Sequence, residues 1–251
     1  MARKYKKISA SILVIGNEIL SGRTQDTNTS TLATWLNSLG VKVGEVRVIP
    51  DVEETIVSTV NLLRKNYNYV FTSGGIGPTH DDITSESVSK AFNLPYEKHQ
   101  EGYKILEAYY KPGEFNDGRQ KMIWMPRGAK LILNPTSGAP GFYVENVFVL
   151  PGVPSILKSM LGGIKNKIVG GNPIISHTIS LRTFESHIAD SLTEVQNKYQ
   201  DVEIGSYPFF QAGKLGVSIV MRSDDQNLIN KCSSDVMSFV NDKKIEVVER
   251  D

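Results

Sequence analysis

Apolar and polar positions follow one another along the first part of the chain in an order that predicts alternating strands and helices. The predicted strands are residues 8–16, 42–49 and 69–72, and the predicted helices are residues 27–39, 51–65 and a segment that begins near Asp82. The first strand is continuously apolar in its second half, as in a strand buried on both faces. The helices carry apolar residues such as Leu32 and Leu36 on one face. This alternation predicts a parallel sheet with helices on both faces.

The pattern becomes less regular after residue 92 and then changes at a glycine-rich segment. Predicted helices follow at residues 99–110, 116–125 and 155–161, and predicted strands at residues 129–133 and 142–150. Glycine and proline in residues 162–173 mark a domain boundary. The segments beyond it are residues 174–181, 184–199, 202–206, 216–222, 225–240 and 244–248, in the order β-α-β-β-α-β. We therefore predict a three-layer α/β/α domain over residues 8–168 and a smaller ferredoxin-like α+β domain over residues 172–251.

Charge and cysteine content narrow the classes of function. The chain has 28 Lys and Arg against 27 Asp and Glu, a formal net charge of +1. This balance argues against nucleic acid as the main partner, because binding to a phosphate backbone needs a basic excess. Cys232 is the single cysteine, so neither a disulfide framework nor a cysteine-based zinc site is expected. No apolar run has the length of a signal peptide or a membrane span, and we expect a cytoplasmic protein without a membrane partner.

The strongest local signal for chemistry is the glycine loop, which we define as residues 73–82, SGGIGPTHDD. It leaves the carboxyl end of a predicted parallel strand, where such sheets bind their ligands. Its three glycines let the backbone approach a ligand and turn N–H groups toward an anion. The next helix begins directly afterwards, and its positive end points to the same place. The spacing is not that of a P-loop, so ordinary NTPase chemistry is not expected.

Carboxylates follow the same predicted strand ends. Asp81 and Asp82 close the glycine loop, while Glu18 and Asp51 follow the first and second strands. Asp26 opens the first long helix. Each of these residues is individually explained as a turn or helix cap, and capping stays an alternative for Asp82. A carboxylate beside a phosphate cradle repels the ligand unless a cation lies between them, so the pattern predicts Mg²⁺ or a similar hard ion.

Four motifs occur in order along the chain. They are residues 15–23, IGNEILSGR; residues 26–28, DTN; residues 74–82, GGIGPTHDD; and residues 150–154, LPGVP. Together they resemble the molybdopterin-binding-like domain of the competence/damage-inducible CinA proteins. Residues 25–56 are also similar to the N-terminal domain of animal FAD synthases. The resemblance covers residues 8–165 closely and continues more loosely through residues 184–186 and 204–208.

This resemblance implies a fold and two kinds of activity. The wider MoaB/Mog group binds molybdopterin with this fold, and Asp51 and Asp82 match its two catalytic aspartates. The branch of CinA and FAD synthase implies divalent-metal-dependent cleavage of pyrophosphates such as ADP-ribose or FAD. Asn17 stands where many relatives have Asp, which weakens a metal role at that position.

We therefore expect a hydrolase, a nucleotide pyrophosphatase that cleaves a dinucleotide such as FAD or ADP-ribose into two monophosphates. The expected catalytic residues are Glu18, Asp51 and Asp82, and the expected metal ligands are Asp51, Asp81 and Asp82, for Mg²⁺, Mn²⁺ or Co²⁺. The expected substrate-binding residues are Arg23, Asn28, Gly74, Gly75, Ile76, Gly77, Pro78, Thr79, Ser137 and Gly138.

Two alternatives use the same cleft. One is a molybdopterin-binding protein of molybdenum cofactor metabolism, and the other is a non-catalytic nucleotide-binding module. In each case the partner is a small phosphate-bearing molecule, a dinucleotide or a pterin. We also expect a homo-oligomer. The candidates in the second domain for closing over the cleft or for forming a dimer surface are Glu185, Ser186, His187, Tyr207 and Arg222.

Overall fold

The computed structural model describes residues 8–211 and 213–248. The chain divides into two compact units, one ending at Gly171 and the other beginning at Asn172, and each is described by itself. None of the described helices is long and apolar enough to cross a membrane.

The first unit is built on a six-stranded sheet in the order β2-β1-β3-β8-β7-β6. Its strands are β1 (Ser9–Ile15), β2 (Lys42–Ile49), β3 (Tyr69–Ser73), β6 (Lys130–Ile132), β7 (Gly141–Val144) and β8 (Val147–Leu150). Strands β2, β1, β3 and β8 pair in parallel, whereas β7 and β6 add antiparallel pairs at one side. The predicted parallel α/β sheet is confirmed in its first half, and the second half is mixed.

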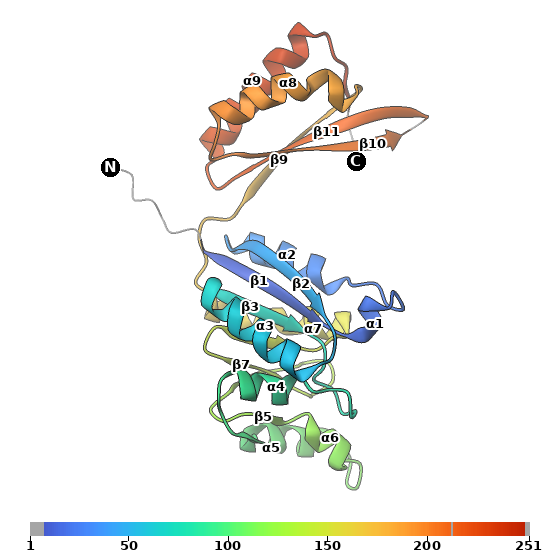
Figure 1. Ribbon diagram of the computed structural model, residues 1–251, viewed down its shortest axis with the longest axis vertical. Helices are drawn as coiled ribbons and strands as arrows, with labels where there is room; N and C mark the ends of the chain where they lie inside the picture. The colour runs from blue at the N-terminus through green and yellow to red at the C-terminus, as the bar shows by residue number, and fades with distance from the viewer. Residues whose placement is uncertain (1–7, 212, 249–251) are drawn as a thin grey trace, which may run out of the picture. The chain divides into compact units, whose positions relative to one another are not determined.

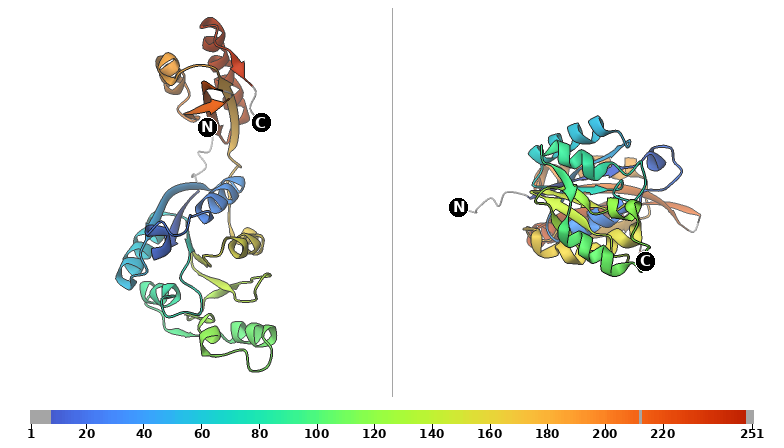
Figure 2. Two further views of the ribbon diagram at one scale, coloured as in Figure 1. Left: turned by 90° about the vertical axis from the view of Figure 1, so that its right-hand side faces the viewer. Right: turned by 90° about the horizontal axis from the view of Figure 1, so that it is seen from below.

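Helices cover both faces of this sheet, as Figure 2 shows for α3 and α4 (cyan and teal) against α7 (yellow). The helices of the unit are α1 (Asn17–Leu20), α2 (Asn28–Ser38), α3 (Glu53–Asn66), α4 (Thr84–Ala91), α5 (Gln100–Tyr109), α6 (Asp117–Lys121) and α7 (Pro154–Ile164), followed by a 3₁₀ turn (Lys165–Lys167). One core packs Leu13 and Val70 against α3 and α4. The other packs Ile12 and Phe71 against α2 and α7. Successive strand residues face opposite cores, which explains why β1 reads as continuously apolar.

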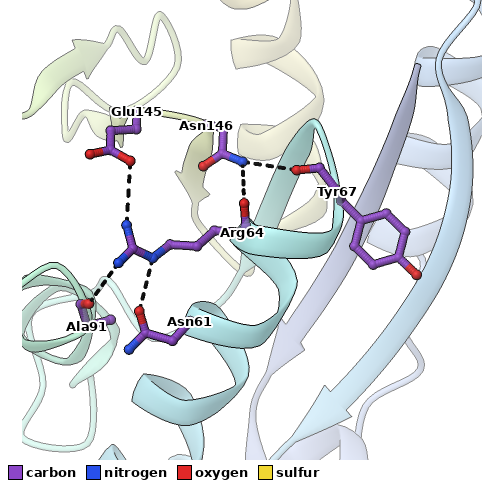
Figure 3. A network of polar contacts seen from close by, with 6 residues as sticks. All are labelled: Asn61, Arg64, Tyr67, Ala91, Glu145 and Asn146. Atoms are coloured by element: carbon purple, nitrogen blue, oxygen red, sulfur yellow. Dashed lines mark hydrogen bonds and ion pairs between the residues drawn. The ribbon is translucent and has the colours of Figure 1, made fainter. Parts of the chain in front are cut away.

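A hairpin replaces the single strand that was predicted for residues 142–150. Strands β7 and β8 pair antiparallel around a turn at Glu145 and Asn146, and Glu145 has a φ of 49°. The Asn146 side chain donates to the backbone carbonyls of Arg64 (2.9 Å) and Tyr67 (3.1 Å) (Figure 3). Arg64 in turn contacts Glu145, Asn61 and the carbonyl of Ala91. The prediction was wrong because both halves of the hairpin are buried and show no alternation.

A small antiparallel pair, β4 (Tyr96–Lys98) with β5 (Trp124–Pro126), was also absent from the prediction. The helix predicted for residues 116–125 ends at Lys121, and its last residues form β5 instead. The Asn116 side chain caps α6 by accepting from the Arg119 N–H (3.0 Å). Three residues pairing across a distance of about thirty positions leave no signal in local propensity.

The second unit has the predicted β-α-β-β-α-β order. Its elements are β9 (Ile175–Leu181), α8 (Glu185–Lys198), β10 (Glu203–Gln211), β11 (Lys214–Ser223), α9 (Gln226–Asp242) and β12 (Val247–Val248). The sheet order is β10-β11-β9-β12 and every pair is antiparallel, as in ferredoxin-like folds. Its core contains the buried thiol of Cys232. At the edge strand β10, the Ile204 N–H donates to Gln196 Oε1 of α8 (3.1 Å).

Candidate functional site

The candidate site lies at the carboxyl ends of β1, β2 and β3. In the sheet Ile15 is level with Ile49 and Val14 with Ser73, so the segments that follow these strands leave from one edge. Figure 1 shows α1, which follows β1, at this edge. The expectation that Glu18, Asp51 and the glycine loop share one edge therefore agrees with the register of the strands.

The backbone of the glycine loop adopts conformations that exclude side chains. Gly74 has a φ of 108°, and a Cβ there would lie 2.1 Å from the backbone oxygen of Ile15. Gly75 has a φ of 68°, and a Cβ there would lie 2.1 Å from Thr84 Oγ1. Glycine is therefore required at both positions, by left-handed backbone and by close packing.

Several N–H groups of the glycine loop are available to a ligand. The Gly74 N–H donates to the carbonyl of Leu150 (3.1 Å), so this amide is already used. Within the described part of the chain, the N–H groups of Gly75, Ile76 and Gly77 have no acceptor. Successive N–H groups that converge in a turn make an anion nest. Residues 75–77 have the unpaired N–H groups that such a nest needs, and Gly74 fixes the loop to β8.

Asp51 lies beside this nest and has a perturbed acidity. Its Oδ2 accepts from the Asn17 N–H (2.9 Å), and its Oδ1 lies 3.6 Å from the position of a Cβ on Gly75. The pKa of Asp51 is raised, first by desolvation and then by the negative charges of Glu18 and Asp81, against the Asn17 hydrogen bond. Two neighbouring carboxylates, Glu18 and Asp81, thus act on Asp51 at this edge. The prediction that Asp51 caps the next helix was wrong, because the N-cap of α3 is Val52 and Asp51 turns toward α1.

Asp82 holds the end of the glycine loop in a tight turn. Its carboxylate accepts from the Thr79 N–H (2.8 Å) and the Thr79 hydroxyl (2.5 Å). Asp82 Oδ2 would also lie 2.6 Å from a Cβ on Gly77. The capping alternative for Asp82 is not what the structure shows, because α4 begins two residues later and its N-cap is Ile83. Asp82 therefore faces the loop that it follows.

Glu18 and Asp26 have different local roles. The Glu18 carboxylate folds back over Gly16, where a Cβ would lie 2.6 Å from both of its oxygens. Its charge reaches Asp51. Asp26 Oδ1 accepts from the N–H groups of Asn28 (2.9 Å) and Thr29 (3.1 Å) at the start of α2. Asp26 is thus accounted for by local capping, whereas Glu18 belongs to the group of carboxylates.

Asn28, the first residue of α2, bonds to the start of the glycine loop. Its side chain is 6% exposed, and its Nδ2 donates to Ser73 Oγ (2.8 Å) and to the carbonyl of Gly152 (2.7 Å). Its Oδ1 is buried without a partner among the described residues. A buried acceptor without a donor is costly, and a ligand or water that donates to it would remove the cost. Asn28 was predicted from the sequence, but its two partners were not.

Other predicted residues form no hydrogen bond or ion pair with the glycine loop among the described residues. Arg23 is exposed and has no hydrogen bond or ion pair within the described residues. Ser137 accepts from Asn134 Nδ2 (2.7 Å), and Gly138 packs against the ring of Tyr109. These contacts belong to a loop beside α5, and among the described residues Ser137 and Gly138 form no hydrogen bond with residues 74–82.

Sequence reasoning missed the contribution of α6 to the edge of the glycine loop. Lys121 Nζ donates to the backbone carbonyl of Thr79, and a Cβ on Gly118 would lie 3.5 Å from the carbonyl oxygen of Pro78. These contacts join positions about forty residues apart. They depend on the tertiary placement of α6, and the local sequence gives no signal for them.

The predicted metal ligands are Asp51, Asp81 and Asp82. Across residues 8–211 and 213–248, the His, Cys, Asp and Glu side chains form no group of three or more that could hold a metal ion. Mg²⁺ commonly takes only one or two carboxylates and completes its shell with water and substrate phosphates. The donors present fit such an ion only together with a phosphate ligand, and the cation stays a prediction.

Comparisons with known proteins agree with the fold. Residues 11–170 match the family model described as "Probable molybdopterin binding domain", and residues 173–249 match "FAD synthase, middle domain". A protein of Archaeoglobus fulgidus is 34% identical over 234 residues, covering 93% of this chain and 98% of that protein. A protein of Pyrococcus abyssi is 32% identical over 257 residues, covering 96% and 99%.

One solved structure extends this comparison to three dimensions. A crystal structure of the protein CinA from Thermoplasma acidophilum, described as of unknown function, is similar with a TM-score of 0.61 and 29% identity. The match covers 64% of this chain and 99% of that one. With a family model matched over more than half of its length, the chain belongs to the molybdopterin-binding domain family, and a FAD synthase middle domain follows. The similarity to CinA is consistent with the resemblance seen in the sequence.

Proposed function

We propose that this site binds a molecule with a diphosphate bridge, such as FAD or ADP-ribose, and hydrolyses it to two monophosphates with a divalent cation. One observation carries the proposal. Asp51, whose pKa is raised first by burial and then by the charges of Glu18 and Asp81, lies beside the N–H groups of residues 75–77, which have no acceptor among the described residues. A phosphate and these carboxylates become compatible when a cation lies between them. A site that only binds anions has no use for such a group of negative charges.

The residues of the chain have distinct parts in this reaction. The N–H groups of residues 75–77 and the positive end of α4 hold one phosphate in place. Asp82, with Asp51 or Glu18, would hold the cation beside that phosphate. When bound, the cation would supply Lewis-acid chemistry and would make a water molecule more acidic. A bond forms between the water oxygen and one phosphorus, the bridging bond at that phosphorus breaks, and the bridging oxygen leaves with the other monophosphate.

The geometry of Asp51 supports its part. The Asn17 N–H fixes one carboxylate oxygen at 2.9 Å, so Asp51 keeps its orientation beside Gly75. Asn17 takes part through its backbone, which fits a position where the side chain differs from the aspartate of many relatives. The Asn28 Oδ1 is a further acceptor, suited to a hydroxyl group of the ligand.

The test is product analysis with the purified full chain. FAD, ADP-ribose and related dinucleotides are incubated with the protein and with Mg²⁺, Mn²⁺ or Co²⁺, or with a chelator, and the nucleotides are resolved by chromatography. We expect monophosphates only with a cation. Asp51→Asn and Asp82→Asn should each lower turnover by about a hundredfold or more, because each removes a charge that holds the cation.

Glu54→Gln is the matched control, because Glu54 is exposed in the first turn of α3, three residues after Asp51. Its turnover should equal that of the unchanged protein. Equal turnover with and without the chelator, or full activity in Asp82→Asn, would contradict the proposal.

A second candidate function is pterin binding, because the matched family model is described as a probable molybdopterin-binding domain. Tight binding of molybdopterin without turnover of any dinucleotide would favour it. Dinucleotide binding without turnover, unchanged by Asp82→Asn, would instead favour a non-catalytic module. The same purified protein and variants therefore decide among the three functions.

A further inference from the structure

The short helix α6 lies against the glycine loop, although the two are far apart in the sequence. Gly118 approaches the carbonyl oxygen of Pro78, and Lys121 Nζ donates to the carbonyl of Thr79. These contacts hold an ammonium group at the part of the loop that lies between Gly77 and Asp82. The Lys121 ammonium group is therefore at the rim of the nest, near Asp81.

Lys121 keeps most of its donor capacity for another partner. An ammonium group has three N–H donors, and the Thr79 carbonyl takes one of them. No carboxylate in the described residues forms an ion pair with Lys121, in contrast to Lys90, which pairs with both Glu53 and Glu86. The charge of Lys121 nevertheless reaches this edge, where it acts on Asp81.

A diphosphate ligand needs more anion-binding groups than the loop supplies. The three free N–H groups of residues 75–77 suffice for one phosphate, and the nearby carboxylates repel the other. The buried Asn28 Oδ1, which has no partner among the described residues, is a further polar atom at this edge that a donor from a ligand would satisfy. We propose that Lys121 binds the second phosphate of a diphosphate-bridged ligand, with the Thr79 carbonyl holding its ammonium group in position. This inference rests on the proposed function and names the group that recognises the diphosphate.

The test is the affinity of the full chain for inorganic pyrophosphate, measured by titration calorimetry at fixed Mg²⁺ and two salt concentrations. Lys121→Met should weaken binding at least tenfold and reduce its salt dependence, because a charged contact is lost. Lys104→Met is the matched control, since Lys104 is exposed on α5 without a hydrogen bond or ion pair in the described structure. Its affinity should not change.

Two further variants separate phosphate binding from mere support of the loop. Lys121→Gln keeps a donor for the Thr79 carbonyl but removes the charge, so it should bind as weakly as Lys121→Met. Lys121→Arg keeps the charge and should recover a large part of the affinity. Full affinity in Lys121→Gln, or no affinity of the unchanged protein for pyrophosphate, would overturn the inference.

This outcome is separate from that of the proposed hydrolysis. Pyrophosphate binding that depends on Lys121 supports the inference even when no dinucleotide is cleaved, a result that would count against the hydrolase alone. Cleavage of a dinucleotide with the same KM in Lys121→Met as in the unchanged protein would count against the inference and leave the hydrolase standing.

Discussion

The two ends of the parallel strands in the first unit differ in whether their charged and polar groups are paired. At the amino end, Arg64 donates to Asn61, Glu145 and the Ala91 carbonyl (Figure 3). Its guanidinium also lies 4.0 Å from the centre of the Phe92 ring. At the carboxyl end, the charges of Glu18 and Asp81 oppose ionisation of Asp51, and the N–H groups of residues 75–77 have no acceptor among the described residues. The paired end stabilises the fold, and the unpaired end is where we propose that the ligand binds.

The comparison shows where this unit tolerates unfavourable interactions. Like charges and the burial of a carboxylate lower the stability of the ligand-free protein, and binding of an anion with its cation would offset these contributions. Changes at the amino end should therefore alter stability alone, whereas changes at the carboxyl end can alter both stability and binding. Three predictions test this division, from the largest effect to the smallest.

The largest effect is expected for Gly75→Ala. The new methyl group would meet Thr84 Oγ1 at 2.1 Å, and the backbone has a positive φ, so the variant should lose about 3 kcal/mol of unfolding free energy or more. Gly113→Ala is the control, because Gly113 also has a positive φ but has open space around it. It should lose about 1 kcal/mol. Denaturant titration measures both, and equal losses would show that packing around Gly75 contributes nothing.

Arg64→Ala should have the next effect, a loss of about 2 kcal/mol, because several hydrogen bonds and the Phe92 contact disappear together. Turnover or ligand affinity per folded molecule should stay the same. Lys65→Ala, at the exposed neighbouring position, should change unfolding free energy by less than about 0.5 kcal/mol. A Kd for the ligand that changes in Arg64→Ala would break the proposed separation of the two ends.

The smallest effect concerns the pH dependence of stability at Asp51. The pKa of Asp51 is higher in the folded than in the unfolded chain. At pH values between these two pKa values the folded state therefore binds more protons than the unfolded state, and its stability falls as pH rises. The stability contributed by the protonated form is present below the unfolded pKa and is lost as pH rises through the folded pKa. Asp51→Asn removes this loss.

Denaturant titrations at a series of pH values check the prediction. The unfolding free energy of Asp51→Asn, relative to the unchanged protein, should increase from about pH 4 upward and then level off. Glu54→Gln should show no such increase, because Glu54 is exposed and outside the group of carboxylates. A difference that falls with pH would mean that Asp51 gains more from Asn17 than it loses to its neighbours.

Elements with a strong local pattern were predictable, and contacts between distant segments were not. The strand of residues 42–49 has the predicted bounds because it alternates between half-buried and exposed positions. The hairpin of residues 141–150 was missed because its two strands are apolar and almost entirely buried, with only Glu145 and Asn146 between them. In a fully buried pair, periodicity does not distinguish one long strand from two short ones.

The candidate site shows the same division. The glycine loop was recognisable, since its glycines are dictated by backbone conformation and by close packing at Gly74 and Gly75. The orientation of Asp51 was not, because an aspartate before a helix has the same local pattern whether it caps the helix or bonds to Asn17. The contact of Lys121 with Thr79 depends on the placement of α6 and has no counterpart in local sequence.

The edge strand β10 has a consequence for assembly. The Ile204 N–H points away from β11 and already donates to Gln196. Pro208, four residues further along β10, faces the same side of the strand and has no N–H. A strand from another molecule that docked along β10 would therefore find two absent donors in its path. An assembly that joins the sheets of two second units edge to edge along β10 is thus not expected.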